Sequence, residues 1–321
     1  MLNAHLLEDF DEESQAGLRA QLDRRVQLTI GADVPPQTHM LIGGRPAREQ
    51  LIACPELCAV IVPWAGVPEE TRDMLRDFPQ ITVHNLHHNA AATAEMALAL
   101  LLSAAKFIVP IDRRLRANDW SPLYAPSRAI GLHGTTALIV GYGQIGQRVG
   151  RACRALEMTV LATRRRRLEQ DGIAEIHPMS DLTHLLPSAQ ALIITAPLTS
   201  ETKGLMGENE IALLPRGALL VNVGRGVIVD EAALYQALST GHLAAAGLDV
   251  WYNYPRNEAG RTNTPPSQYP FHELDNVIMS PHRGGDEAGI DAVRMQHLAE
   301  LLNAAARGEE MPNRVDMAAG Y

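Results

Sequence analysis

The chain has 321 residues, enough for two domains of roughly 100 to 200 residues each. Apolar residues make up 46% and charged residues 20% of it, so a large core can be buried and a disordered chain is excluded. The 28 basic and 37 acidic side chains leave a net charge of −9, and aromatic residues amount to only 4%. This balance argues against a nucleic-acid partner, which requires a basic face or a base-stacking platform.

The three cysteines, Cys54, Cys58 and Cys153, are too few for a disulfide framework and do not form a zinc motif. The first residues turn acidic rather than basic and then apolar, so we expect no signal peptide. The longest apolar stretch, Met96 to Ala105, is too short to span a bilayer. We therefore expect reduced thiols, no membrane partner and a cytoplasmic location.

Short apolar runs alternate with longer helix-like segments along the chain. The runs predict buried strands at 59–62, 81–83, 135–140, 159–162, 191–195, 218–223, 244–248 and 277–280. The segments between them predict helices, the clearest at 93–107, 144–156 and 231–238. Strands that alternate with helices indicate an α/β fold with a parallel sheet. The stretch from Tyr252 to Pro270 is rich in Asn and Pro and is predicted to be a long loop.

A glycine-rich motif follows one of the predicted strands. Gly141, Gly143 and Gly146 form G-x-G-x-x-G, and a helix with an apolar face begins inside it at Gln144 and Ile145. In this context the first glycine permits a tight turn, the second lets the backbone approach a pyrophosphate, and the third lets the helix pack on the strand. The helix N-terminus supplies N–H groups for the phosphates. The motif therefore predicts a dinucleotide-binding site.

The next predicted strand runs into Thr163, Arg164 and Arg165, and two further arginines follow. A dinucleotide-binding domain that prefers NAD usually carries an acid here, which accepts a hydrogen bond from the ribose 2′-hydroxyl. This chain has no acid before Glu169. A guanidinium suits a 2′-phosphate, so the sequence favours NADP over NAD, with NAD still possible. The alternative interpretation of the arginines is a solvated charge cluster.

Further segments complete a pattern that is typical of one enzyme family. They are Pro197–Thr199, Asn222–Glu231, Gly247–Val250 and Ser280–Gly285. Together with the glycine motif, they make the chain resemble the D-isomer-specific 2-hydroxyacid dehydrogenases. The resemblance extends from about residue 40 to about residue 300, with the motifs in the family's order.

The resemblance implies two doubly wound parallel-sheet domains with the active site in the cleft between them. A Rossmann cofactor domain at 95–284 would be inserted in a flavodoxin-like substrate domain formed by 1–94 and 285–321. The implied substrate is a small 2-oxo or 2-hydroxy acid, and the implied assembly is a homodimer formed chiefly by cofactor domains. The resemblance also assigns cofactor-binding roles to Pro197, Thr199, Val223 and Asp249.

The family's chemistry moves hydride from the nicotinamide to the carbonyl carbon of an oxo acid, and charge develops on the carbonyl oxygen. The resemblance makes Arg225 the residue that binds the carboxylate and carbonyl oxygens through its planar fork. It makes His282, beside the cofactor, the general acid in reduction and the general base in oxidation. Backbone N–H groups of Ala65, Gly66 and Val67 would grip the substrate carboxylate.

The chain departs from the family pattern at Tyr254. The family usually has a glutamate there, which hydrogen-bonds the histidine and raises its pKa. Without that carboxylate, the pKa of His282 is expected near its ordinary value of about 6.5. Formate dehydrogenases of this superfamily also lack the glutamate, but they have a glutamine. Three replacements are open here: the hydroxyl of Tyr254, the side chain of Asn253, or Glu258 returning from the long loop. Tyr254 is our candidate third catalytic residue.

His84, His87 and His88 have spacings that could suit a metal, but no carboxylate or cysteine lies close to them in the sequence. We expect histidines that line the cleft or are solvated, and no metal. Arg45 is a candidate for binding an extra anionic group of the substrate, and Trp64 for shaping the pocket; ordinary loop packing is the alternative for both.

The sequence thus predicts an NADPH-dependent reductase of small 2-oxo acids, of the glyoxylate or hydroxypyruvate type. One alternative is a changed chemistry marked by Tyr254, such as formate oxidation or a bulkier oxo acid. Phosphite oxidation is disfavoured because Ala65 replaces the lysine expected in phosphite oxidisers. The other alternative is a dinucleotide-sensing interaction protein of the transcriptional corepressor branch, which the presence of both Arg225 and His282 argues against.

Overall fold

The chain folds into two units, each built on its own parallel sheet. The computed structural model describes residues 1–165 and 170–317. Unit 1 comprises Met1–Asn89 and Asp286–Tyr321, and unit 2 comprises Ala90–Gly285, so unit 2 is inserted into unit 1. The first boundary coincides with the start of helix α4 (Ala90–Lys106), a helix that the sequence predicts from Thr93.

Unit 1 contains a five-stranded sheet with the strand order β2-β1-β3-β4-β5, in which all neighbours are parallel. Its strands are β1 (Leu2–Leu6), β2 (Val26–Ile30), β3 (Met40–Ile42), β4 (Ala59–Val62) and β5 (Thr82–Asn85). This is the flavodoxin-like order of a doubly wound sheet. The sequence did not predict β1, β2 or β3; in β1, Asn3 and His5 interrupt the apolar pattern. His5 is nevertheless buried, and its ring bonds the Thr29 hydroxyl at 2.8 Å.

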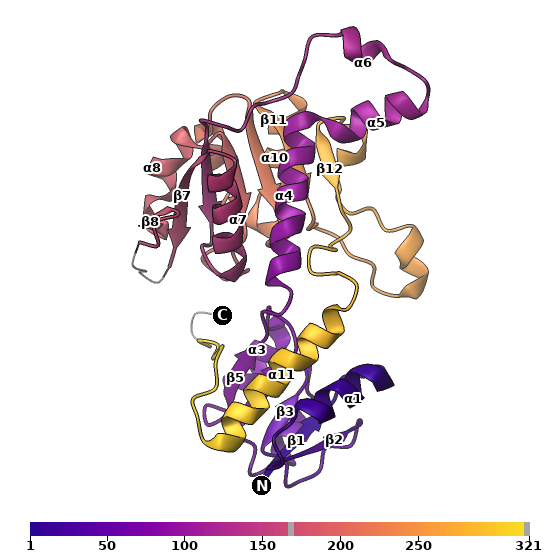
Figure 1. The fold of residues 1–321 in the computed structure, drawn as a ribbon, viewed down its shortest axis with the longest axis vertical. Coiled ribbons are helices and arrows are strands. Elements are labelled where there is room, and N and C mark those ends of the chain that lie inside the picture. Colours follow the sequence, from indigo (N-terminus) through magenta and orange to yellow (C-terminus); the bar gives the residue numbers. More distant parts are fainter. Residues whose placement is uncertain (166–169, 318–321) are drawn as a thin grey trace. The chain divides into compact units, whose positions relative to one another are not determined.

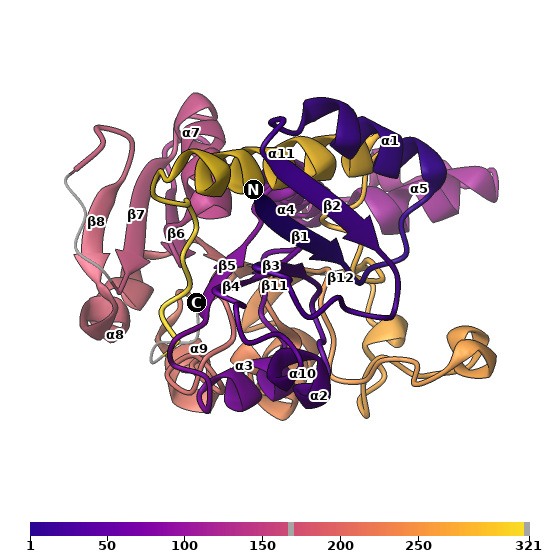
Figure 2. The same ribbon diagram turned by 90° about the horizontal axis from the view of Figure 1, so that it is seen from below.

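Helices cover both faces of the sheet in unit 1 (Figure 2). The helices are α1 (Glu12–Gln21), α2 (Arg48–Ile52), α3 (Glu69–Leu75) and α11 (Ile290–Arg307). One core cluster joins α1 and α11 to the sheet through residues such as Leu18 and Leu298, and the other joins α2 and α3 to it through Leu51 and Leu75. Fully buried parallel strands such as β4 are apolar throughout because both faces are covered.

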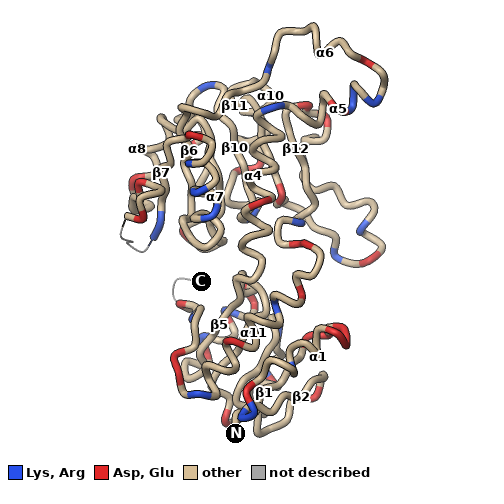
Figure 3. Tube along the Cα trace, in the orientation of Figure 1, with Lys and Arg blue, Asp and Glu red and all other residues tan. Residues whose placement is uncertain are grey.

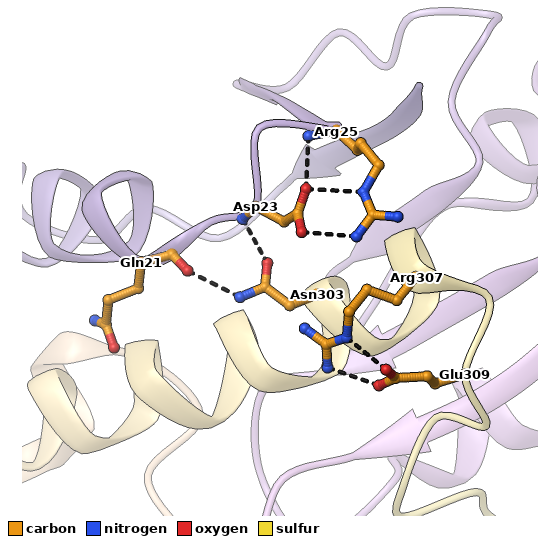
Figure 4. Close-up of polar contacts among 6 residues, drawn as sticks. All are labelled: Gln21, Asp23, Arg25, Asn303, Arg307 and Glu309. Carbon is orange, nitrogen blue, oxygen red and sulfur yellow. Dashed lines mark hydrogen bonds and ion pairs between the residues drawn. The ribbon is translucent and has the colours of Figure 1, made fainter.

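The C-terminal helix α11 is bonded to the end of α1 through Asn303 (Figure 4). The Asn303 amide donates to the carbonyl oxygen of Gln21 at 2.8 Å, and its oxygen accepts from the backbone N–H of Asp23 at 2.7 Å. Because α1 ends at Gln21, the first of these bonds satisfies a carbonyl that the helix end leaves open. Residues from opposite ends of the chain therefore complete one core.

Unit 2 contains a seven-stranded sheet with the order β12-β11-β10-β9-β6-β7-β8, again with parallel neighbours. Its strands are β6 (Thr136–Val140), β7 (Thr159–Arg164), β8 (Glu175–Pro178), β9 (Ala191–Ile194), β10 (Ala218–Asn222), β11 (Leu243–Leu248) and β12 (Val277–Met279). The order reverses between β6 and β9, as it does in a Rossmann sheet. The fold class expected from the sequence is confirmed.

Helices also cover both faces of the sheet in unit 2 (Figure 1). Two of them, α4 and α7 (Gln144–Ala155), share one core cluster with the sheet, while α8 (Leu182–Leu185), α9 (Glu208–Leu213) and α10 (Glu231–Ser239) share the cluster of the other face. Short 3-10 helices occur at Met179–Asp181, Leu186–Ser188, Gly226–Ile228, Glu258–Thr262 and Phe271–Glu273.

A segment of unit 2 projects away from its sheet and carries α5 (Ile108–Arg116) and α6 (Ser121–Tyr124) (Figure 1). Within the described ranges, no helix by itself has both the length and the apolar composition needed to cross a membrane. Among the described helices, α4 and α5 meet those criteria when taken together, and the chain bends by 67° between them.

Candidate active site

The glycine motif lies where the strand order of unit 2 reverses, at the carboxyl end of β6. Gly141 has φ 95°, and a Cβ there would lie 2.5 Å from the Cα of Ala196, which follows β9. The Thr195 hydroxyl donates to the carbonyl oxygen of Gly141 at 2.7 Å. Doubly wound sheets bind their ligands at this kind of crevice. Gly141 is therefore required by the backbone itself, whatever the ligand.

Gly143 and Gly146 differ in what surrounds them. A Cβ on Gly146 would lie 2.6 Å from the carbonyl oxygen of Gly141, so this glycine allows α7 to pack on the turn. A Cβ on Gly143 would meet nothing within 4 Å and would point into open space. The amides of Gln144 and Ile145, in the first turn of α7, donate to no acceptor in the described residues. Open space beside unbonded N–H groups fits the pyrophosphate of a dinucleotide.

The end of β7 lies against the same turn. The carbonyl oxygen of Thr163 accepts hydrogen bonds from the N–H groups of Gly141 and Tyr142, both at 3.0 Å. The Arg164 guanidinium donates to the carbonyl oxygen of Tyr142 at 3.2 Å, and Arg165 is half-buried beside it. Figure 3 shows the basic residues at the end of β7. The other two arginines of the run, Arg166 and Arg167, lie outside the described residues.

The remaining predicted cofactor residues follow neighbouring strands. Pro197 and Thr199 form a turn after β9, in which the carbonyl oxygen of Pro197 accepts from the Thr202 hydroxyl at 2.7 Å. Val223 follows β10, is buried, and donates its N–H to the carbonyl oxygen of Ile194 at 3.1 Å. The carboxyl ends of parallel strands meet at one edge of a sheet, so these residues lie along the edge that carries the glycine motif.

Arg225 extends from the same edge, just after β10. The buried side chain of Asn222 donates to the carbonyl oxygen of Arg225 and accepts from the N–H of Gly224, both at 3.0 Å, which fixes the turn. One guanidinium nitrogen of Arg225 donates to the carbonyl oxygen of Gly224 at 2.7 Å. In the part of the chain that the structure describes, its other N–H groups have no acceptor. They are therefore available to an anionic ligand.

Asp249 follows β11 and organises the turn that carries His282. One of its carboxylate oxygens accepts from the Ser280 hydroxyl at 2.6 Å and from the N–H of Arg283 at 2.8 Å, and the other accepts from the N–H of Gly284 at 2.7 Å. Asp249 is buried, so these bonds compensate for its lost hydration. The resemblance predicts that Asp249 contacts the cofactor. The structure adds that Asp249 holds the turn of His282 in place through these hydrogen bonds.

His282 follows β12 with φ 58°, a backbone conformation that is costly for most residues other than glycine. Its ring packs against the ring of Tyr254, with centroids 5.5 Å apart and an angle of 56° between the planes. The Tyr254 hydroxyl does not bond the imidazole; it accepts from the backbone N–H of Trp251 at 3.0 Å. Glu258 instead pairs with Arg261 at 2.7 Å. No described residue hydrogen-bonds the His282 ring, so none of the three expected replacements for the glutamate does so.

The pKa of His282 is lowered from its ordinary value. Desolvation by the surrounding protein is the largest cause, and the positive charge of Arg225 adds to it, while the Asp249 carboxylate opposes both. The pKa of His282 therefore lies below the ordinary value, whereas the missing glutamate alone predicts a pKa nearer to that value. The sequence correctly indicates that the carboxylate is missing, but the closeness of Arg225 to His282 follows only from the fold.

The predicted substrate loop of unit 1 follows β4. The amides of Ala65, Gly66 and Val67 donate to no acceptor in the described ranges, and the carbonyl oxygen of Ala65 accepts from the Asn85 amide at 2.6 Å. The Trp64 ring lies over Gly44, where a Cβ would be 1.9 Å from it. This loop therefore offers unbonded N–H groups, as an anion site requires.

The strand order of unit 1 reverses between β1 and β3, which identifies a residue that the sequence analysis missed. Glu8, just after β1, accepts from the backbone N–H of Gly44 at 2.8 Å. In the sequence, Glu8 appears only as part of an acidic N-terminus. Recognising β1 as a strand would have placed Glu8 at the crevice of the unit-1 sheet. Arg45 is exposed in the same turn.

Two of the three candidate histidines, His84 and His88, have structural partners. His84 bonds the carbonyl oxygen of Pro312 at 2.8 Å, and His88 accepts from Arg294 at 3.2 Å. Burial, with the charge of Arg294, lowers the pKa of His88 to about 4, and burial also lowers the pKa of His87. Nowhere in the described ranges do three or more His, Cys, Asp or Glu side chains gather as metal ligands would.

Comparisons with known proteins identify the family of the chain. Residues 98–284 match the family model described as the D-isomer specific 2-hydroxyacid dehydrogenase, NAD binding domain. The chain is 36% identical over 229 residues to glyoxylate reductase of Korarchaeum cryptofilum, which covers 70% of this chain and 65% of that protein. It is 35% identical over 233 residues to D-3-phosphoglycerate dehydrogenase of Archaeoglobus fulgidus, covering 71% and 41%. The chain thus spans less than two thirds of the length of these curated relatives.

Among solved structures, the chain resembles a D-isomer specific 2-hydroxyacid dehydrogenase from Xanthobacter autotrophicus in complex with NADPH and MES. The two are 25% identical with a TM-score of 0.82, and the match covers 99% of each chain. The resemblance expected from the motifs is confirmed. The chain belongs to the D-isomer specific 2-hydroxyacid dehydrogenase family, and unit 2 contains its NAD binding domain.

Proposed function

We propose that this protein is an NADPH-dependent reductase of small 2-oxo acids, of the glyoxylate or hydroxypyruvate type. One observation carries the proposal: the guanidinium of Arg225 and the imidazole of His282 follow β10 and β12 of the unit that also holds the glycine motif. A cation with unbonded N–H groups and a titratable ring beside a dinucleotide site suit reduction of an oxo acid. The names of the relatives support this class, but they cover more than one substrate.

Residues of this chain then bind and orient the substrate and supply the proton. NADPH, when bound, supplies the hydride that goes to the carbonyl carbon. Arg225 orients the carboxylate and carbonyl oxygens and stabilises the negative charge that develops on the carbonyl oxygen. His282 donates a proton from a ring nitrogen to that oxygen, which yields the hydroxyl of the product. The amides of Ala65, Gly66 and Val67 stay the predicted site for the substrate carboxylate.

The choice of NADPH depends on Arg164. Its guanidinium is bonded to the glycine motif, where a ribose 2′-phosphate is expected, and no acid stands in that position. The similar Xanthobacter protein was solved in complex with NADPH, which is consistent with this choice. A cytoplasmic location stays a prediction from the sequence.

The test measures nicotinamide absorbance after the purified protein is mixed with 2-oxo acids, in parallel reactions with NADPH and with NADH. Turnover of glyoxylate or hydroxypyruvate that is faster with NADPH supports the proposal. Oxidation of formate, or turnover of bulkier oxo acids alone, would favour the changed chemistry. Absence of turnover with every substrate, together with tight NADPH binding in a separate titration, would favour a dinucleotide-sensing interaction protein instead.

The pH dependence of the reduction follows from the environment of His282. Protonated His282 is the acid, so lowering its pKa means that the proton is lost at a lower pH. We expect kcat/KM for oxo-acid reduction to fall as pH rises through a value below the ordinary one of about 6.5. Tyr254→Glu places a carboxylate beside the ring and should move the fall to higher pH by about one unit.

The matched control for this prediction is Tyr254→Phe, which keeps the ring contact with His282 and removes only the hydroxyl. It should leave the pH profile in place, since that hydroxyl bonds Trp251 and not the imidazole. A wild-type rate that stays level to about pH 8 would contradict the assigned role of His282 as the acid.

We further propose that the protein forms a homodimer through the projecting segment of unit 2. This segment exposes a set of large apolar side chains, which monomers rarely leave in water. They are Ile108, Ile111, Leu115, Trp120, Leu123 and Tyr124, with exposed fractions from 44% to 84%. The family resemblance makes a second copy the expected partner for them.

Replacing Leu123 and Tyr124 by Asp should convert the dimer to a monomer, measured by sedimentation equilibrium or light scattering. The control is Ile52→Asp, an apolar position in unit 1 that is 65% exposed and lies outside the segment. A wild-type protein that is monomeric at micromolar concentration would refute the dimer, and a dimer that survives the double replacement would exclude this surface.

A further inference from the structure

Tyr142, the second residue of the glycine motif, connects that motif to both described ends of the β7–β8 connection. The described residues of this connection are Arg165 and 170–174, and Arg164 ends β7 just before it. The carbonyl oxygen of Tyr142 accepts from Arg164 at 3.2 Å, at the start of the connection. The hydroxyl of Tyr142 donates to a carboxylate oxygen of Asp171 at 2.7 Å, near its end.

The side chain of Tyr142 is built into unit 2. It is fully buried, and Gly150 of α7 faces it: a Cβ on Gly150 would lie 3.1 Å from the ring and 3.2 Å from the hydroxyl. A glycine inside a helix is unfavourable by itself, so here it makes room for the tyrosine. A buried hydroxyl requires a hydrogen-bond partner, which Asp171 supplies from a solvent-exposed position.

Asp171 also organises the chain that enters β8. Its second carboxylate oxygen accepts from the N–H groups of Ile173 and Ala174, at 2.9 and 3.0 Å. The side chain of Gln170 bonds the N–H and the carbonyl oxygen of Ile176, at 3.0 and 3.1 Å. The end of the connection is therefore fixed to β8, and the Tyr142–Asp171 bond fixes it to the glycine motif.

We propose that the Tyr142–Asp171 hydrogen bond is a positioning device for recognition of the 2′-phosphate of NADPH. This bond holds the end of the connection against the glycine motif, while the carbonyl oxygen of Tyr142 holds Arg164 at its start, so that Arg164 and Arg165 are in place before the cofactor binds. Preorganised groups lose less conformational freedom on binding, so affinity rises without any new contact. The inference rests on the proposed preference for NADPH, because the 2′-phosphate is the group that distinguishes NADPH from NADH.

The test is Tyr142→Phe, which keeps the ring against Gly150 and removes only the hydroxyl. Dissociation constants for NADPH and NADH are measured by fluorescence titration, and thermal unfolding checks that the variant is folded. We expect the Kd for NADPH to rise about fivefold to tenfold and the Kd for NADH to change by less than about twofold. The matched control is Tyr252→Phe, since Tyr252 is half-buried and its hydroxyl donates to the carbonyl oxygen of Val229 at 3.0 Å, away from the connection.

A double-mutant cycle with Asp171→Ala identifies the bond itself, because two residues that act through one bond give non-additive effects. Unchanged affinities in Tyr142→Phe, or an equal loss for NADPH and NADH, would overturn the inference while leaving the proposed function intact. A wild-type protein that binds NADH as well as NADPH would instead overturn the proposed cofactor preference, and this outcome is read from the wild type alone.

Discussion

Arg225→Ala is expected to reduce kcat/KM for the oxo acid by about 10³-fold, while NADPH binds as before. The alanine removes both the fork that orients the substrate and the positive charge that opposes the developing oxyanion. The backbone turn should survive, because Asn222 holds it through backbone atoms of Gly224 and Arg225 that the substitution leaves in place. The measurement pairs steady-state kinetics with an NADPH titration.

Two further variants test whether the reaction needs the planar fork of Arg225 and whether the loss is specific to this arginine. Arg225→Lys keeps a charge but not the planar fork, so its rate should lie between those of the wild type and the alanine variant. Arg216→Ala removes an exposed arginine elsewhere in unit 2, and it should leave the rate unchanged. If Arg225→Ala kept more than about a tenth of the wild-type rate, the assignment of the substrate site would be wrong.

Gly143→Ala and Gly141→Ala should separate cofactor binding from folding. At Gly143 the backbone has φ −98°, which any residue can adopt, and a Cβ would meet no protein atom within 4 Å. We expect its free energy of unfolding to change by less than about 0.5 kcal/mol. The Kd for NADPH should nevertheless rise by about tenfold or more, because the new methyl group would occupy the space predicted for the pyrophosphate.

Gly141→Ala should destabilise the fold by about 3 kcal/mol or more, since φ is 95° and a Cβ would be 2.5 Å from the backbone of Ala196. Gly217→Ala is the control for φ alone: it has φ 87° with nothing within 4 Å, so its cost should be about 1 kcal/mol. Thermal or denaturant unfolding measures all three variants. Normal NADPH affinity in a folded Gly143→Ala protein would argue that this loop does not bind the pyrophosphate.

Local patterns in the sequence were sufficient to predict those parts of the site that are formed by residues adjacent in the chain. The three glycines, the strand before them and the helix after them occupy a continuous stretch, so the motif and the β6–α7 unit could be predicted together. The absence of an acid at Arg164, and of the family's glutamate at Tyr254, could also be read directly. The alternation of apolar runs indicated the α/β class, but it failed for β1, β2, β3 and β8. In β1, the buried His5 owes its stability to a partner on another strand.

Tertiary structure decided everything that depends on residues distant in the chain. Asp249 and Ser280 are 31 positions apart, and Tyr142 and Asp171 are 29 apart, so no local pattern could reveal their hydrogen bonds. The same holds for the lowered pKa of His282, which depends on desolvation and on the charge of Arg225 rather than on adjacent residues. The sequence by itself thus determined the family, the fold class and the candidate reacting groups. Only the folded chain decided which hydrogen bonds hold those groups in place and how their pKa values shift. The reason is that hydrogen bonds and electrostatic interactions depend on distance in space and not on distance along the chain.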